Sequence, residues 1–384
     1  MKITSIDGTV HDIKDMIIDV NIWENVLEQF LSARLIMIDT LDLQQNMPLI
    51  GNEKVEIIFE QMGERRLLNF KVYKLDKQPV NMSDSKKVRA LNLYLCSEEK
   101  LTNEMKKISK KYTGSGDTII TDVLTTALSS AKAFNFTAAQ DDLEIYSNYW
   151  SPSQLIEFIC RNSSTSLYSD YIFWEDMKGF NFYPLSELLA QTQIHEVTFQ
   201  KEDILTIAKT SVALSWKFNS YFDILTSMKM GLFGQRDLDF DTSTYEYTNT
   251  EKSLDEILEN ITTLGNNLPY DSALFNADNF HPGVLYNKDI SPIRTTSMKM
   301  LNTYNIILKM NGDLVRKPGD ILNLKFVNID NEQLIHKSFY GKWFIIAVNN
   351  LIDMTGKFEQ NLLLTKNAFF RDPRLPLISS HKNV

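Results

Sequence analysis

A turn followed by an alternating strand occurs twice in this chain, and this repeat constrains the fold more than any other feature of the sequence. Residues 50–59 read IGNEKVEIIF, and residues 317–326 read KPGDILNLKF. Alternation of apolar and polar side chains with a period of two is typical of a β-strand that buries one face. The alternating apolar residues correspond at an offset of 267 positions, with Val55, Ile57 and Phe59 in the first copy and Leu322, Leu324 and Phe326 in the second.

Landmarks on either side of the strand keep nearly the same offset. Tyr73 in FKVYKL corresponds to Trp343 in GKWFII at 270 positions, Asn92 corresponds to Asn361 at 269, and RLIMID from residue 34 corresponds to NIILKM from residue 305. The shared strand order predicts a duplicated antiparallel β-barrel, with two unrelated barrels as the alternative. The predicted structural landmarks of the turns and repeats are Gly51, Asn52, Phe59, Tyr73, Gly319, Asp320, Phe326 and Trp343.

Length and composition describe an ordinary globular protein. The chain has 384 residues, of which 43% are hydrophobic and 23% charged, and this length predicts two or more hydrophobic cores. The longest apolar runs stop well short of the ~20 residues that a membrane-spanning helix needs, and the N-terminus has no apolar signal core. We therefore expect a soluble protein that is made in the cytoplasm and does not insert stably into a membrane.

Net charge and cysteine content argue against a nucleic-acid-binding surface and against a metal site built on cysteine. The net charge of −9 argues against a surface that grips nucleic acid through its phosphates, although nucleic acid could pass such a surface without sticking. Cys96 and Cys160 lie in apolar segments without a metal-type partner, which predicts two reduced thiols in the core.

The first hundred residues are rich in short runs of β-forming residues separated by polar turns, and they predict a small barrel or sandwich. One segment differs, because the apolar residues of NIWENVLEQFLSARL, from Asn21, have a spacing that predicts a helix sharing the core of the barrel. From Ser97 the pattern becomes mixed, with polar helix residues at 98–110 and a capped helix at 118–130.

Two further signals lie in this middle region. Ser151 and Gln154 form a capping box that opens a helix with proline at its first position. The following stretch, YIFWEDMKGFNFYPL, predicts a hairpin of two aromatic strands with a tight turn that ends at Gly179. Residues 233–296 form an insertion rich in Asp, Asn, Thr and Tyr, in which Ser253 and Glu256 cap one helix, and strand signals return at residues 303–366.

Residues that commonly carry chemistry do not form a recognisable site. The five histidines are scattered, so that a zinc site has little support. The stretch DLDFDTSTYEYT starts like a calcium loop, but Thr242 and Thr248 replace the required glycine and glutamate, which favours a solvated acidic loop. The turn at residues 114–116 lacks the lysine of a phosphate loop. We expect neither a cofactor nor a metal ion.

Two features of the aromatic hairpin require separate interpretation. Glu175 and Asp176 are the most suggestive carboxylate pair, since glycoside hydrolysis needs two carboxyl groups. They are adjacent and lie at a predicted hairpin tip, so the sequence favours exposed turn residues. The aromatic residues of the hairpin, from Tyr168 to Tyr183, could form a platform for a sugar or a base, but a core with one interaction surface is the better interpretation.

The order of these features resembles that of the baseplate central hub proteins of T-even-type contractile-tailed bacteriophages, which are related to the hub part of type VI secretion spike proteins. The residues that carry the resemblance are the strand and turn around Gly319 and Asp320, the strand GKWFIIAVNNLID with the closing NLLLTKNAF, the first copy GNEKVEIIF, and the helix and hairpin WSPSQLIEFICRNSSTSLYSDYIFWEDMKGFNF. The resemblance covers residues 1–370.

The resemblance implies an α+β, mainly β fold, with two similar tail-tube-like β-barrels, an α+β domain between them and an insertion in the second barrel. Carried over, the first barrel is residues 1–105, the middle domain 106–199, the second barrel 200–232 with 297–370, the insertion that packs on the middle domain 233–296, and a C-terminal tail 371–384. The acidic, Tyr-rich insertion and the short tail depart from the pattern, and they leave the contacts that face the spike open.

The resemblance also implies a structural virion protein of the tail baseplate. Three chains would form a pseudo-sixfold ring that joins the sixfold tail tube to the threefold cell-puncturing spike. Its partners would be the spike, the tail tube and tube-initiator proteins, and the tape measure protein, while DNA passes through the channel without specific binding. We expect no catalysis. Two alternatives stay open on the sequence: a tail-associated peptidoglycan hydrolase, which needs a carboxylate pair, and a carbohydrate-binding tail module that uses the aromatic hairpin.

Overall fold

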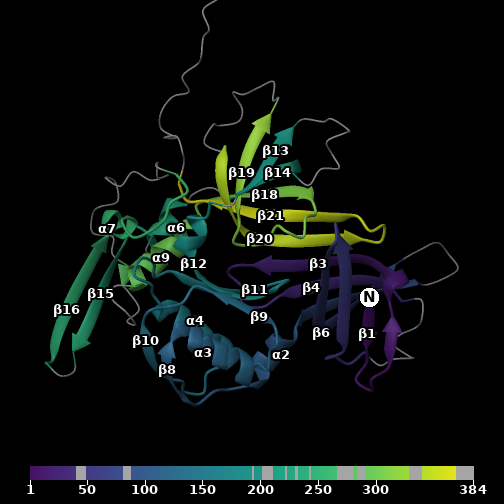
Figure 1. The fold of residues 1–384 in the computed structure, drawn as a ribbon, viewed down its shortest axis with the longest axis horizontal. Helices are drawn as coiled ribbons and strands as arrows, with labels where there is room; N and C mark the ends of the chain where they lie inside the picture. The colour runs from purple at the N-terminus through teal and green to yellow at the C-terminus, as the bar shows by residue number, and fades with distance from the viewer. Residues whose placement is uncertain are drawn as a thin grey trace, which may run out of the picture.

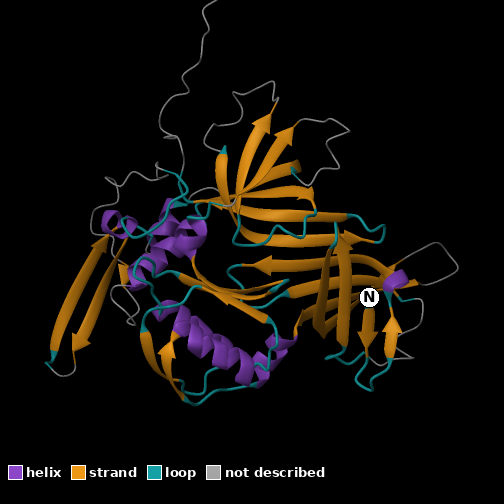
Figure 2. Ribbon diagram, viewed as in Figure 1, coloured by secondary structure: helices purple, strands orange, loops and turns teal. Residues whose placement is uncertain are grey.

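The computed structural model of this chain is mainly β, with helices gathered on one side (Figure 1, Figure 2). It describes residues 1–39, 49–80, 88–192, 194–200, 211–220, 223–229, 232–241, 244–265, 281–282, 290–327 and 340–368. The predicted C-terminal tail, residues 371–384, lies outside the described residues. In the part of the chain that the structure describes, every helix is too short or too polar to span a bilayer.

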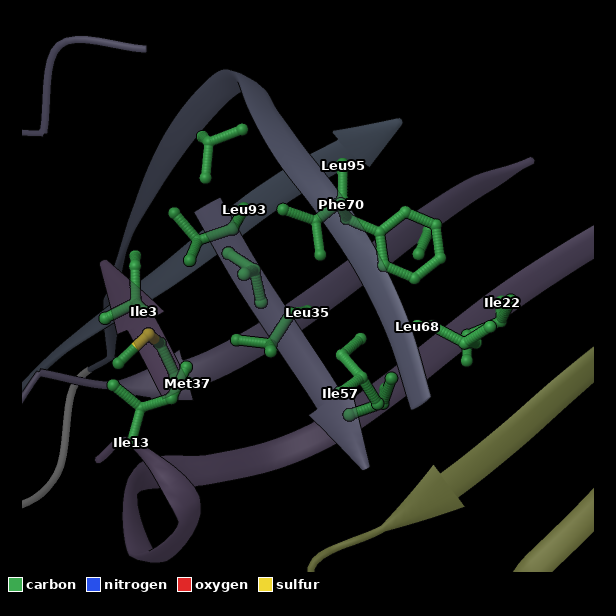
Figure 3. Packing of buried hydrophobic residues seen from close by; sticks show 14 of the residues in the cluster. Ile3, Ile13, Ile22, Leu35, Met37, Ile57, Leu68, Phe70, Leu93 and Leu95 are labelled. Atoms are coloured by element: carbon green, nitrogen blue, oxygen red, sulfur yellow. The ribbon is translucent and has the colours of Figure 1, made fainter. Parts of the chain in front are cut away.

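In its described residues, the N-terminal unit contains seven strands and one short 3-10 helix. Its hydrogen-bonded strands run in the order β3-β4-β7-β6-β5-β1-β2. Side chains that alternate along these strands fill one core, as Leu35, Ile57 and Leu93 show in Figure 3. The bounds are β1 Lys2–Thr4, β2 Val10–Asp12, η1 Lys14–Met16, β3 Ile17–Asn25, β4 Ser32–Ile38, β5 Lys54–Gln61, β6 Glu64–Val80 and β7 Val88–Ser97.

The helix predicted within residues 21–35 is wrong, because this segment is the end of β3, a turn and the start of β4. The misleading periodicity has a physical cause. β3 is buried on both faces, with Val20 and Ile22 in the core of the first unit, while Val26, just after the strand, joins a second core shared with the middle region. A strand that is covered on both sides loses the simple alternation by which strands are recognised.

The second barrel closes completely. Its six strands follow the order β19-β13-β14-β18-β21-β20, and β20 pairs again with β19. Leu308, Leu322, Trp343 and Leu362 are fully buried at its centre. The bounds are β13 Ile194–Gln200, β14 Val212–Ser220, β18 Tyr304–Asn311, β19 Ile321–Val327, β20 Gly341–Asp353 and β21 Phe358–Lys366.

The two units have the same pattern of strand pairing, which confirms that the fold contains two similar β units. β4 pairs with β3 and β7 as β18 pairs with β14 and β21, and β6 pairs with β5 and β7 as β20 pairs with β19 and β21. A β-bulge lies at the same point of both, between Val72 and Lys74 opposite Leu95, and between Ile345 and Ala347 opposite Leu364.

These bulges fix the residue equivalence between the two units. β6 corresponds to β20 at an offset of 273 (Val72 to Ile345), and β7 to β21 at 269 (Leu95 to Leu364). The pairing then gives 267 for β5 and β19, as the sequence predicted. Two predicted correspondences are wrong. Tyr73 corresponds to the bulge residue Ile346, because Trp343 corresponds to Phe70, and β4 matches β18 at 273 rather than 271. A low-identity alignment cannot locate a bulge, which adds one residue to a single strand.

The middle region is α+β and contains both aromatic strands that the sequence predicts. β11 and β12 form an antiparallel hairpin, and β9 adds to β12 in parallel. The capping box of α4 is confirmed, because the Gln154 amide nitrogen donates to Ser151 Oγ and the Ser151 nitrogen donates to Gln154 Oε1. The bounds are α2 Glu98–Met105, β8 Lys111–Ser115, α3 Gly116–Asp122, η2 Val123–Ala127, β9 Ala133–Phe136, β10 Asp142–Tyr146, α4 Pro152–Asn162, β11 Tyr171–Asp176, β12 Gly179–Pro184 and α5 Leu185–Leu189.

The insertion forms helices beside the middle region and a long hairpin that extends away from it (Figure 1). The segment that starts like a calcium loop is part of this hairpin, so its first residues are in a strand rather than in the predicted loop. The predicted cap of Ser253 and Glu256 is confirmed at the start of α7. The bounds are β15 Gly234–Asp241, β16 Glu246–Ser253, α7 Leu254–Leu258, β17 His281–Pro282 and α9 Ile290–Met300, and α6 Ile224–Lys229 lies just before the predicted start of the insertion.

Candidate functional site

The most highly organised polar region of the described chain is the junction at which the two barrels and the β11–β12 hairpin meet. β3 of the first unit pairs antiparallel with β20 of the second, from Asp19 opposite Asp353 to Asn25 opposite Ala347. The tip of the hairpin, residues 175–179, reaches this seam, and the Met177 nitrogen donates to Glu24 Oε2 over 2.9 Å. The junction therefore joins all three parts of the fold.

Glu175 and Asp176 are buried at this junction, so the prediction of exposed turn residues is wrong. Their exposed fractions are 1% and 2%. Asp176 Oδ1 accepts hydrogen bonds from the backbone nitrogens of Lys178 and Gly179, which closes the tight turn. Local pattern identified the turn correctly, but it could not show that the turn would be covered by two distant barrels.

Glu175 anchors the hairpin to its surroundings through one lysine. Lys132 Nζ lies 2.5 Å from Glu175 Oε1 and 2.6 Å from Glu99 Oε2, and the Leu31 nitrogen donates to the other oxygen of Glu175 over 2.9 Å. Burial alone would lower the pKa of Lys132, but the two carboxylates outweigh this effect and raise it. Lys132 therefore stays charged and holds two negative side chains that would otherwise repel each other.

Glu24 begins a second network that runs from the hairpin into the second barrel. Glu24 Oε1 accepts from Asn350 Nδ2 over 2.7 Å, and Asn350 Oδ1 accepts from Gln360 Nε2 over 2.8 Å. Gln360 Oε1 in turn accepts from Arg316 over 2.7 Å. Burial, reinforced by the nearby Asp176, raises the pKa of Glu24 to about 7. The network fixes the side chains along the seam, because each buried polar group depends on the next one.

An apolar layer accompanies these networks. Trp174 of the hairpin packs with Ile321, Phe344 and Ile346 of the second barrel and with Val26 next to β3. Gly319 lies directly against this indole, since a Cβ atom at Gly319 would come within 3.3 Å of Trp174 Cζ2. The position of the hairpin is thus set by close packing against both barrels as well as by charge.

The turn landmarks show how the two barrels begin their corresponding strands. Asn52 donates from its nitrogen to the Val72 carbonyl oxygen, as Gly319 donates to the Ile345 carbonyl oxygen. Asn52 therefore corresponds to Gly319. The sequence prediction matched Gly51 with Gly319 and Asn52 with Asp320, and this match is wrong by one position. Both residues have positive φ angles, 72° and 93°. The next residue is acidic in both turns, and Glu53 and Asp320 each accept from the backbone nitrogen three residues earlier.

The other landmarks are not brought together into one site. Phe59 lies near Phe358 of the second barrel, with ring centroids 6.1 Å apart. Tyr73 is half exposed beside Tyr94. Trp343 is fully buried, and Phe326 lies in β19 with a side chain outside the described set. Asp320 accepts a hydrogen bond from the Lys317 nitrogen and lies 3.0 Å from His195 Nε2.

The side chains on which the two chemical interpretations of the hairpin depend are mostly buried. Both carboxyl groups of the suggestive pair are buried, and the aromatic residues Tyr171, Phe173, Phe180 and Phe182 are buried in the middle core. In the described ranges, no three His, Cys, Asp or Glu side chains are placed to hold a metal ion together. Cys96 and Cys160 are free thiols in the core, as predicted.

Sequence reasoning missed Glu24, Glu99 and Lys132, which complete the junction. Glu175 lies 43 positions from Lys132, and Asn350 lies 326 positions from Glu24. Acidic residues inside predicted strands or helices were the only available signal. Such residues are usually solvated, and nothing local distinguishes a buried one.

Comparison with solved structures supports the fold. A tail protein from Neisseria meningitidis matches with a TM-score of 0.58 and 9% sequence identity, over 97% of this chain and 98% of that one. A 43 kDa tail protein of prophage MuSo2 from Shewanella oneidensis matches with a TM-score of 0.54 and 8% identity, over 95% of this chain and 97% of that one. No family model matches the sequence, and neither does any curated protein.

The two matches extend over nearly the whole length of both partners, so they include the barrels, the middle region and the insertion together. At 8–9% identity, they establish the fold and not the function. The chain therefore has the fold of bacteriophage tail proteins. The resemblance predicted from the order of its sequence motifs is confirmed at that level.

Proposed function

We propose that this chain is a structural component of a phage-type tail, namely the central hub of its baseplate. The supporting observation is the pair of similar β units in one chain, which lie side by side through β3 and β20. A chain that carries two equivalent units can occupy two positions of a ring, so that three chains present six equivalent units. A trimer of this kind could match a sixfold tube on one side and a threefold spike on the other.

In this proposal, the domains are those predicted from the sequence: barrels at 1–105 and at 200–232 with 297–370, a middle domain at 106–199, an insertion at 233–296 and a tail after residue 370. β13, which begins at Ile194, is added to the second barrel because it pairs with β14 and β19. Packing of the insertion on the middle domain is supported by Arg294 of α9, which donates to the Cys160 carbonyl oxygen and lies 3.6 Å from Glu157.

The junction has a specific role in this hub. It fixes the angle between the two barrels, because the hairpin contacts both of them through Glu24 and Gly319. A ring closes only if each unit is rotated by the same amount relative to its neighbour. The partners would be the spike protein, the tail tube and tube-initiator proteins and the tape measure protein, with DNA passing through the channel. The protein would be made in the host cytoplasm and would act in the virion without catalysis.

Sedimentation analysis and native mass spectrometry test this proposal. The chain is expected to form a particle of three times its own mass, either alone at high concentration or when co-purified with a cell-puncturing spike protein. A chain that stays monomeric under both conditions would contradict the hub function. The two alternatives need surfaces that the described structure buries: the Glu175–Asp176 pair and the aromatic hairpin.

A further inference from the structure

The seam inside the chain shows how two barrels of this type join. Opposite β3, the segment of β20 that follows the bulge makes regular antiparallel pairs, for example Asn21 with Leu351. Hydrogen bonds from Val26 nitrogen to Ile346 oxygen and from Met354 nitrogen to Ile18 oxygen mark both ends of this ladder. Since hydrogen-bonded and non-hydrogen-bonded pairs alternate, Asn21 and Leu351 form a non-hydrogen-bonded pair.

β6 is the counterpart of β20 in the first unit, and one edge of its corresponding segment has no strand partner among the residues that the structure describes. β5 covers β6 only from Glu64 to Lys71. Beyond the bulge, residues 74–80 have β7 as their only strand neighbour in the described part of the chain. Among the described residues, the edge of β6 that corresponds to the seam edge of β20 therefore has no strand partner.

The counterpart of β3 is β14. Both strands carry a bulge at the same point, between Ile17 and Asp19 and between Ala213 and Ser215, which gives an offset of 196. β14 pairs with β18 from Ala213 to Ser220, and the described pairs with β13 include Val212 and Ala213 alone. The two halves of the internal seam, β20 and β3, thus each have a counterpart. In the sheet order, β14 lies three strands before β20, and β6 lies three strands after β3.

We propose that β6 of one protomer pairs antiparallel with β14 of the next protomer, in the register that β20 and β3 use within the chain. In the internal seam, Leu351 of β20 lies opposite Asn21 of β3. Leu351 corresponds to Gln78 at the offset of 273, and Asn21 corresponds to Lys217 at the offset of 196. Gln78 of one protomer therefore lies opposite Lys217 of the next. The pairing extends over residues 77–80 of one chain and 215–218 of the next. This inference rests on the proposed trimer, and it specifies the strand edges and the register that the trimer uses.

One feature of the β6 edge agrees with this role, and a second limits how many hydrogen bonds the pairing can form. Tyr73 and Tyr94 correspond to Ile346 and Leu363, which are buried or partly buried in the internal junction, whereas Tyr73 is half exposed in the single chain. A neighbouring barrel would cover this aromatic pair. The second feature is Pro79, whose missing N–H would face the neighbouring chain, because its counterpart Ile352 lies in a hydrogen-bonded pair with Val20. Pro79 can only accept there, which limits the length of the ladder.

Engineered disulfides test the register. In the double variant Gln78→Cys with Lys217→Cys, the two residues lie opposite each other on neighbouring protomers, and non-hydrogen-bonded pairs bring side chains within disulfide range. Mild oxidation of the purified chain is expected to give covalent dimers and trimers on a non-reducing gel, and reductant is expected to remove them. The matched control is Gln78→Cys with Ser215→Cys, which is displaced by two residues and should give at least tenfold less product.

A second control uses the seam that the structure already contains. Asn21→Cys with Leu351→Cys joins the same positions within one chain and is expected to form an intrachain disulfide with no increase in mass. Lys77→Pro provides an independent measurement, since it removes an N–H that would face the neighbour and leaves the ladder with β7 intact. It is expected to weaken trimer formation at least tenfold while the circular dichroism spectrum stays unchanged.

The outcomes separate this inference from the proposed function. Trimers that sediment normally but show no cross-link at residues 78 and 217 would overturn the strand pairing and leave the hub proposal standing. Equal cross-linking in the displaced control would also overturn the register. A chain that remains monomeric at every concentration and with the spike protein would contradict both the hub and the pairing.

Discussion

Replacement of Lys132 by methionine is the most informative perturbation of the junction. Methionine keeps most of the side-chain volume but removes the positive charge that lies within 2.6 Å of both Glu99 and Glu175. Glu175 is fully buried, and Glu99 is 7% exposed, so two carboxylates would be left close together without a counter-ion. We expect a loss of stability that is centred on the hairpin, and a weaker hold of the hairpin on Leu31.

The size of this effect follows from burial. Breaking a buried ion pair by removing one partner costs ~3–5 kcal/mol, because the remaining charge stays desolvated. Lys132 retains 31% exposure, and solvent near the amine screens part of the interaction. The expected loss in the free energy of unfolding is therefore about 2–4 kcal/mol at pH 8. It should shrink on acidification, because protonated carboxyl groups no longer need the counter-ion.

Urea denaturation followed by circular dichroism measures the loss, and hydrogen exchange at the amides of Leu31 and the hairpin shows whether it is local. The matched control is Lys111→Met, which removes a lysine 2.6 Å from Glu144, but in a pair that is about half exposed. Such exposed pairs contribute ~0–1 kcal/mol. A loss at Lys132 no larger than at Lys111, or a loss that does not change between pH 8 and pH 4, would refute the reasoning.

Three further predictions concern the same junction and its surroundings. The pKa of Glu24 is raised to about 7, so the folded state holds a proton that the unfolded state has released, and stability should fall as the pH rises from about 4.5 to about 7. Glu24→Gln should flatten this decline in the urea midpoint. Gly319→Ala should destabilise by ~1–3 kcal/mol, because its φ is 93° and the added Cβ meets Trp174. Phe180→Ala, at a fully buried position of the middle core, should cost ~3–5 kcal/mol.

These three predictions have separate controls. An unchanged pH slope in Glu24→Gln would show that another group controls stability in this range. Gly8→Ala is the control for Gly319, since Gly8 has a similar φ of 89° but no neighbour within 4 Å of the added Cβ. Equal losses at the two glycines would assign the effect to backbone strain alone. For Phe180, thermal melting should show the loss, and a variant as stable as the parent chain would contradict the assignment of this ring to the core.

Local sequence signals correctly predicted those helix caps, turns and strands that depend only on residues close together in the sequence. The capping boxes at Ser151 and Ser253, the tight turn before Gly179 and the alternating strands of β5 and β19 follow from short-range hydrogen bonding and from burial of one strand face. The repeat also gave the mainly β fold with two similar units, because strand order survives low sequence identity. The capping residues and turns act within a few positions, so their effect is encoded where it occurs.

The sequence alone determined that two similar β units flank an α+β region, and it named Glu175 and Asp176 as the most suggestive carboxylate pair while predicting that both are exposed. Only the tertiary structure decided that these carboxyl groups are buried, that Lys132 and Glu24 complete their surroundings, and that β3 joins β20. The bulges at Tyr73 and Ile346 likewise appear only once strands are paired. The physical reason is that burial, counter-ions and register depend on segments up to 326 positions apart, and no local pattern encodes which distant segment will cover a given side chain.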